Sequence, residues 1–168
     1  PFDITGMGQG AHKFQVQVSR ADLSRPVELS EDFFVDTMAP TVTFVAGSLP
    51  GNPSNERAKV IRFTAQDPGG MGLASASCKL NNNPVSCSFS AGTGQGEYAF
   101  NSTSDGQYVL EVTVKDRANF PGVTSYTWKV STNAPEVAFI VSPNAVTNKV
   151  NDDIKVKITH TLPYTATC

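Results

Sequence analysis

The segment YVLEVTVKDRANFPGVTSYTWKVSTNAPEVAF, residues 108–139, decides the fold of this 168-residue chain because its outline occurs twice. The earlier copy is HKFQVQVSRADLSRPVELSEDFFVDTMAPTVTF, residues 12–44. Pro40 of that copy takes the place of Pro135, which lies 95 residues further along the chain. A repeat of this length is a domain and not one turn of a solenoid.

The repeat divides the chain into one complete module and two incomplete ones. We expect the C-terminal strands of a first Ig-like module in residues 1–37, a complete module in 38–132, and the N-terminal strands of a third in 133–168. IRFTA at 61–65 and VKITH at 156–160 share the 95-residue spacing, which supports this division. The chain is therefore predicted to be a window on a tandem array.

The complete module is predicted to be all-β. Charged residues make up only 17% of the chain, and its 13 Gly and 11 Pro favour turns over helices. Seven short segments alternate polar and apolar residues, without helical periodicity between them. They are residues 41–46, 60–65, 74–80, 85–90, 97–100, 107–116 and 123–130. Seven strands at this spacing predict tandem antiparallel β-sandwiches of the immunoglobulin type.

The alternation within the last two segments predicts the core. Leu110, Val112 and Val114 would share one face of their strand, and Tyr126 and Trp128 one face of the next. The alternative is that the aromatic residues form a platform for a ligand. Strict period-2 placement favours the core, with the indole N–H of Trp128 needing a hydrogen-bond partner.

Cys78 and Cys87 are predicted to form a disulfide. They flank the turn-forming residues 81–84, so a hairpin would bring the two thiols together. The competing interpretation is a metal or redox pair, but the intervening residues exceed the CxxC spacing and no His lies nearby. A disulfide implies an oxidising, extracellular setting. Cys168 is the repeat counterpart of Cys78, and its partner is expected past the last residue.

Several motifs follow one another in a recognisable order. They are CKLNNNPVSC at 78–87, SDGQY at 104–108, KDRAN at 115–119, and the joints VDTMAP at 35–40 and VSTNAP at 130–135. This order resembles the tandem immunoglobulin-like repeats, of the bacterial Ig-like type, in large secreted surface, adhesin and filament proteins. The resemblance covers nearly the whole chain, although a Gly of the family pattern is absent from KDRAN. It implies a module of the cell surface, without the bridge between sheets that antibody domains have.

The sequence has no signature of an enzyme. His12 and His160 do not have HExxH spacing, and no GxSxG, P-loop or dinucleotide-binding motif occurs. The Gly-rich GTGQG at 92–96 lacks a following helix and Lys, so it is predicted to be a loop. We therefore expect no catalytic residue and no cofactor.

Charge and hydropathy argue against two kinds of partner. The net charge is only −2 and Lys and Arg form no run, so nucleic acid is not an expected partner. No apolar run approaches the roughly 20 residues that span a bilayer, so we expect no membrane contact by this segment.

Calcium binding is the more specific alternative to a module that holds no metal. Acidic residues lie near predicted module ends or turns, where oxygen ligands can stiffen a joint. They are Asp36, Asp67, Asp105, Asp116, Glu136, Asp152 and Asp153. Each also has an ordinary role in a turn or cap, and VSTNAP has no carboxylate. We therefore expect no metal site, and keep Asp36, Asp116 and Glu136 as weak calcium candidates.

Asn101 is a candidate for N-glycosylation. Asn101, Ser102 and Thr103 match the acceptor sequence and lie between predicted strands, where the amide would be exposed. The modification depends on a glycosylating source organism.

These features favour a non-enzymatic structural module of an extracellular filament, appendage or surface stalk, built from tandem Ig-like domains. The prolines of the two joints restrict the backbone, so successive sandwiches should form a semi-rigid rod. The expected partners are other copies of the same protein or neighbouring Ig-like modules, which would pair along exposed strand edges. The alternative is an adhesin repeat whose loops bind carbohydrate or a host or partner protein.

Overall fold

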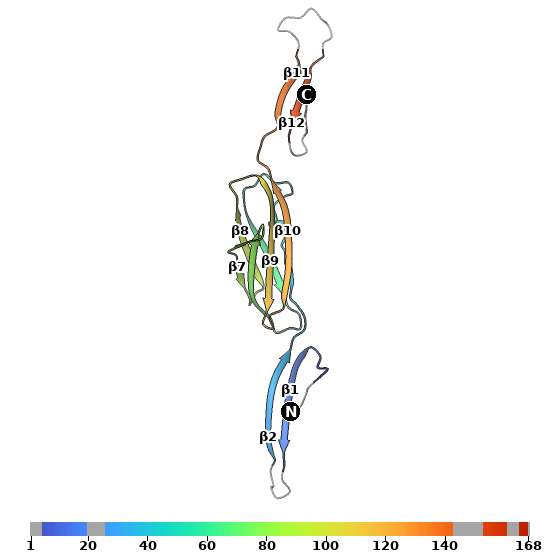
Figure 1. The fold of residues 1–168 in the computed structure, drawn as a ribbon, viewed down its shortest axis with the longest axis vertical. Coiled ribbons are helices and arrows are strands. Elements are labelled where there is room, and N and C mark those ends of the chain that lie inside the picture. Colours follow the sequence, from blue (N-terminus) through green and yellow to red (C-terminus); the bar gives the residue numbers. More distant parts are fainter. Residues whose placement is uncertain (1–4, 20–25, 143–152, 161–164, 168) are drawn as a thin grey trace, which may run out of the picture.

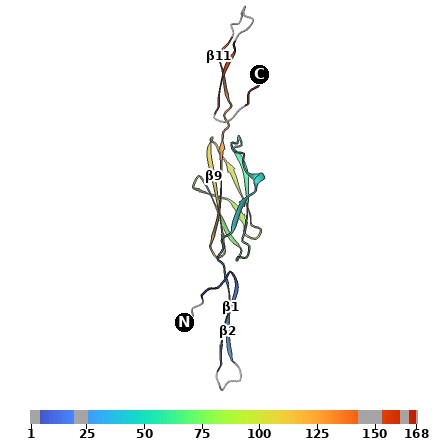
Figure 2. The same ribbon diagram turned by 90° about the vertical axis from the view of Figure 1, so that its right-hand side faces the viewer.

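Three β units follow one another along the long axis of the molecule (Figure 1 and Figure 2). The computed structural model describes residues 5–19, 26–142, 153–160 and 165–167, so Cys168 lies outside the described residues. A hairpin of β1 (Gly10–Val18) and β2 (Val27–Val35) comes first, and a sandwich follows it. A hairpin of β11 (Glu136–Val141) and β12 (Lys155–Thr159) comes last. Within the described ranges, no helix has the length and apolarity to cross a membrane.

Two four-stranded antiparallel sheets form the central sandwich. Their strand orders are β3-β4-β8-β7 and β10-β9-β5-β6. The strands are β3 (Thr41–Phe44), β4 (Ala58–Gln66), β5 (Leu73–Leu80), β6 (Asn83–Val85), β7 (Ser88–Ser90), β8 (Gln95–Asn101), β9 (Gly106–Asp116) and β10 (Pro121–Val130). One short 3-10 turn, η1 (Ala46–Ser48), follows β3. The order β3-β4-β8-β7 is that of the ABED sheet of immunoglobulin-type sandwiches, and β10-β9-β5 is that of the CFG sheet, with β6 as an additional edge strand. The predicted all-β class is confirmed.

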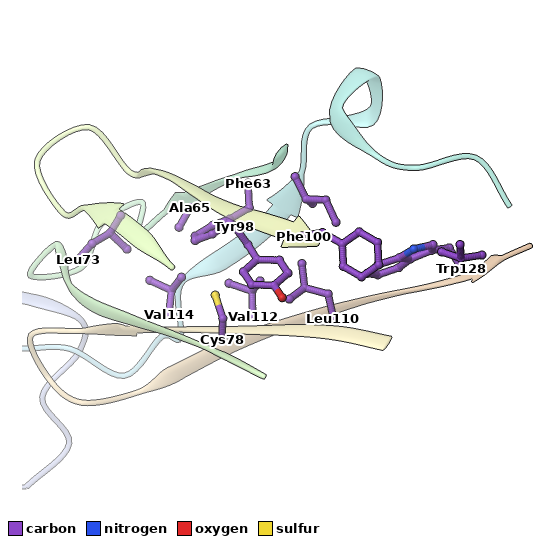
Figure 3. Packing of buried hydrophobic residues seen from close by; sticks show 12 residues of the cluster. Phe63, Ala65, Leu73, Cys78, Tyr98, Phe100, Leu110, Val112, Val114 and Trp128 are labelled. Carbon is purple, nitrogen blue, oxygen red and sulfur yellow. The ribbon is translucent and has the colours of Figure 1, made fainter. Parts of the chain in front are cut away.

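The hydrophobic core lies between the two sheets (Figure 3). Its buried apolar residues are Ile61, Phe63, Ala65, Leu73, Cys78, Tyr98, Phe100, Leu110, Val112, Val114, Trp128 and Val130. The Trp128 ring is fully buried and meets Phe100 edge to face, with 4.8 Å between ring centroids. Its indole Nε1 has no hydrogen-bond partner among the described residues, contrary to expectation. The core prediction for the alternating residues of β9 and β10 is confirmed.

The structure divides residues 85–90 into two strands, where the sequence predicts one. β6 pairs with β5 in one sheet, and β7 pairs with β8 in the other. The chain therefore crosses between the sheets at Ser86 and Cys87. Alternation alone does not reveal such a crossing, because three-residue strands on either side of it keep the same pattern.

The disulfide between Cys78 and Cys87 is present, with 6.1 Å between the two Cα atoms. Cys78 is a buried residue of β5, and Cys87 lies at the crossing and not on a hairpin arm. The bond therefore ties the crossing to the core. The hairpin itself is tighter than expected, because Leu80 pairs with Asn83 and only two residues of positive φ form the turn.

The segment after η1 covers part of the free edge of β10. The Ser54 N–H donates to the Lys129 carbonyl at 2.8 Å, and the Ser131 N–H donates to the Ser54 carbonyl at 2.9 Å. The Tyr126 hydroxyl donates to the Pro50 carbonyl at 2.8 Å. This part of the edge is therefore closed to pairing with another chain.

The two flanking hairpins pair as their repeat counterparts pair in the sandwich. β1 and β2 correspond to β9 and β10, and β11 and β12 correspond to β3 and β4; all four pairs are antiparallel. The hairpins leave apolar side chains such as Leu29 and Phe139 about 70% exposed. No second sheet faces either hairpin in the described part of the chain. The module boundaries at 37/38 and 132/133 stay a prediction.

Candidate functional site at the first joint

The first joint, residues 36–40, connects β2 to β3 and is held against the sandwich by Gln9. The Gln9 amide nitrogen donates to Asp36 Oδ1 and to the Gly69 carbonyl, both at 2.9 Å. Its carbonyl oxygen accepts hydrogen bonds from the N–H and the hydroxyl of Thr37, at 2.7 and 2.8 Å. Gly69 belongs to the loop between β4 and β5. One side chain therefore links the first hairpin, the joint and the sandwich.

Asp36 makes a second link between the joint and the same loop. Its Oδ2 accepts the Met71 N–H at 2.8 Å, and its Oδ1 also accepts the Met38 N–H at 3.2 Å. The hydrogen bond from Gln9, followed by that from the Met71 N–H, lowers the pKa of Asp36 below its ordinary value. Asp36 is therefore a carboxylate at neutral pH.

Asp67 and Asp116 bring two more carboxylates to this end of the sandwich. Asp67 follows β4, and its Oδ2 accepts the Gly72 N–H at 2.8 Å. Asp116 ends β9, and its Oδ1 accepts the Phe120 N–H at 2.9 Å. Each side chain is thus fixed by a turn through one oxygen.

The other oxygens of these two carboxylates are buried and unpaired. Asp67 Oδ1 and Asp116 Oδ2 have no hydrogen-bond partner among the described residues. Asp116 as a residue is only 2% exposed. Gly70 packs directly on the Asp67 carboxylate, and a Cβ at this position would clash with it. Buried polar atoms without partners are uncommon and costly, so these two require an explanation.

The three carboxylates form one cluster, which we call the joint triad. One oxygen each from Asp36, Asp67 and Asp116 lies within 4.8 Å of the others. None of the ion pairs in the described part of the chain includes these three residues. Like charges at this distance repel, the more so where burial limits screening by water. Three converging carboxylates have the chemistry to hold a divalent cation that prefers oxygen ligands.

The three predicted calcium candidates do not lie together in the structure. It brings Asp36 and Asp116 together, whereas Glu136 is exposed at the start of β11, next to the other joint. Asp67 is one of the seven acidic residues that the sequence places near module ends or turns, but it is not one of the three calcium candidates. The sequence offers only a local indication of its role: Asp67 directly follows one core strand, β4, and Asp116 is the last residue of another, β9. Their proximity could not be deduced without knowing that these strand ends meet at one end of the sandwich.

The second joint, residues 131–135, uses a carboxylate differently. Asp105 accepts hydrogen bonds from the N–H and the hydroxyl of Thr132, at 2.8 and 2.9 Å. Arg57 Nη2 lies 2.7 Å from Asp105 Oδ1 and donates to the Thr132 hydroxyl oxygen at 2.7 Å. The N–H of Thr132 is the main cause that lowers the pKa of Asp105, and its hydroxyl and the Arg57 charge add to it. This carboxylate is already neutralised by the protein.

The remaining predicted positions lie apart from both clusters. Asn101 is exposed at the end of β8, as expected for an accessible amide. His12 and His160 lie in different hairpins, and each has its Nε2 close to a backbone carbonyl, that of Gly8 and that of Asn133 respectively. The structure does not bring the two histidines together.

No protein-family model matches this sequence, and a search of curated proteins finds none that is similar to it.

Proposed function

We propose that the chain is a non-enzymatic structural part of an extracellular filament, appendage or surface stalk, built from tandem Ig-like domains. One observation carries the proposal: the hairpin, sandwich and hairpin follow one another in a line, connected by short joints (Figure 1 and Figure 2). A protein that must span distance needs units in this arrangement.

The joints support the proposal because both are fastened to the sandwich. Gln9 and Asp36 hold the first joint, and Asp105 and Arg57 hold the second. Pro40 is buried against β10, where the lack of a Cβ on Gly122 gives its carbonyl room. Hydrogen bonds and proline at a joint reduce bending, which suits a load-bearing rod more than a flexible tether.

The loops at the two ends of the sandwich favour the structural role over adhesion. An adhesin of this architecture would present end loops to its ligand. Here the β4–β5 loop contributes Gly69 and Met71 to the first joint. At the other end, Ser54 bonds to Lys129 and Ser131 beside the second joint. The loops at both ends of the sandwich therefore bind the joints that connect it to the neighbouring hairpins.

The disulfide supports an extracellular location. Cys78 and Cys87 close a short loop inside the sandwich, and such bonds persist in oxidising compartments and are rare in the cytosol. The bond also restricts the unfolded chain and thereby stabilises the sandwich.

Electron microscopy of the native material tests the proposal. β9 has 11 residues, and at about 3.3 Å per residue such strands plus a joint predict an axial repeat of about 40–50 Å. Ordered fibres with this repeat are the expected result. Isolated flexible rods with a ligand at one end would contradict assembly and favour the adhesin alternative.

A further inference from the structure

We propose that the joint triad, Asp36, Asp67 and Asp116, binds one Ca²⁺ ion that fastens the first joint to the sandwich. The site goes beyond the proposed structural role and does not depend on it, since a cation can bind here in a filament, an adhesin or any other assembly of these units.

The buried and unpaired oxygens of Asp67 and Asp116 point to a ligand. Asp116 is 2% exposed, its Oδ2 has no partner, and its carboxylate lies within 4.8 Å of the other two. Neighbouring turns hold each carboxylate through one oxygen and leave the other free. A bound cation would satisfy both unpaired atoms and offset the mutual repulsion of three negative charges.

The ligand type and the spacing favour calcium. Carboxylate oxygens select Ca²⁺, Mg²⁺ or Mn²⁺ over softer metals. Calcium bonds at 2.3–2.6 Å place opposite ligands about 4.6–5.2 Å apart, which accommodates oxygens separated by up to 4.8 Å. Three carboxylates supply three to six of the six to eight oxygens that calcium takes, and water or backbone carbonyls supply the rest. Magnesium requires stricter octahedral geometry and keeps more of its water.

The position of the triad gives the ion a mechanical role. Asp36 belongs to the joint, whereas Asp67 and Asp116 belong to the sandwich. An ion held by all three connects the two parts by a bridge that is present only when calcium is bound. The repeat counterparts of Asp36 and Asp67 in the sequence are Ser131 and Leu162, so the second joint has no such set. We therefore expect one ion per chain.

Calorimetric titration of the metal-stripped chain with CaCl₂ tests the site. We expect one Ca²⁺ per chain with a Kd of about 1 mM or below, in the range of extracellular modules. Asp67→Asn and Asp116→Asn keep the side-chain shape and should each weaken binding by about tenfold or more, because affinity depends on ligand charge. Asp32→Asn, at an exposed position of β2, is the matched control and should bind like the parent. Absence of binding at 10 mM CaCl₂, or unchanged affinity in both triad variants, would overturn the proposal.

Thermal unfolding separates a cation ligand from a carboxylate that only holds a turn. In EDTA, Asp67→Asn should raise the Tm, because it removes repulsion and keeps the acceptor for the Gly72 N–H. In saturating CaCl₂, the parent should gain Tm and this variant should gain much less. A lower Tm for Asp67→Asn in both conditions with an undiminished calcium response would contradict the proposal. MgCl₂ that binds as tightly as CaCl₂ would contradict the assignment to calcium. If Asp116→Asn fails to fold, the results for Asp67→Asn alone test the proposal.

Discussion

The two joints of this chain have the same length and the same final proline, but their carboxylates are balanced differently. At the first joint, three carboxylates meet and none of them has a cationic side chain as a partner among the described residues. At the second, Asp105 is paired with Arg57 and binds the backbone and hydroxyl of Thr132. At the second joint, the protein's own groups neutralise the carboxylate. At the first joint, the negative charge of the three carboxylates is left for a ligand to neutralise.

The difference shows how joints in a repeated fold can differ in the interactions that hold them. The sandwich supplies the same kinds of position at each end, namely strand termini and tight turns. The residues placed there decide whether the carboxylates of a joint are paired with the protein's own groups or left for a cation. Calcium bound at the joint triad would stiffen the first joint and leave the second unchanged.

The largest effect is expected from breaking the packing of the first joint without touching its charges. In Gly122→Ala, the new Cβ would clash with the Pro40 carbonyl, a backbone atom that no rotamer change can move aside. We expect the free energy of unfolding to fall by about 3 kcal/mol or more, measured by urea denaturation. Gly47→Ala is the control, since its Cβ would meet open space. A loss no larger than in the control would show that the joint is not packed against β10.

The next largest effect concerns the sandwich that both joints share. Removal of the disulfide in Cys78→Ala/Cys87→Ala should cost about 2–3 kcal/mol, because the bond closes a loop of about ten residues in the unfolded chain. Urea denaturation measures the loss, and reduction of the parent protein should reproduce most of it. Calcium binding in the folded state should persist, since neither cysteine belongs to the joint triad. If calcium binding disappears while the fold remains, the sandwich and the joint are coupled more closely than the structure indicates.

Acid should loosen the hydrogen bonds that hold the second joint. The folded pKa of Asp105 is lowered from 3.8, so its contribution to stability is complete above about pH 4 and is lost as the pH falls through the folded pKa. Amide exchange of the Thr132 N–H, which donates to Asp105, should therefore accelerate in acid relative to amides in β9. In Asp105→Asn the same amide should already exchange faster at pH 7, with a smaller further change on acidification. An identical profile in parent and variant would contradict the role of Asp105.

The smallest effect is expected from an ion pair that belongs to neither joint. Lys79 and Glu111 approach to 3.2 Å on neighbouring strands, with side chains 51% and 37% exposed. Lys79→Ala should change the free energy of unfolding by less than about 1 kcal/mol, because exposed pairs are screened by water. Hydrogen exchange at Thr132 should stay unchanged in Lys79→Ala and increase in Arg57→Ala, since only Arg57 donates to Thr132. Equal exchange in the two variants would remove the distinction between the second joint and an ordinary surface pair.

The sequence by itself determined the repeat, the all-β class, the core faces of β9 and β10 and the pairing of Cys78 with Cys87. The last three of these follow from local rules. Alternation of period 2 assigns one face to each side chain, and two cysteines close in sequence on either side of a turn are close in space.

Only the tertiary structure decided where the chain crosses between sheets and which carboxylates meet. The sequence at Ser86 and Cys87 does not indicate the crossing, because the three-residue strands on either side continue the same alternation of polar and apolar residues. Asp36, Asp67 and Asp116 are far apart in the sequence, and each has an ordinary turn role nearby. They converge because β4 and β9, in opposite sheets of the sandwich, both end beside the first joint, and this depends on strand order, which no single segment encodes.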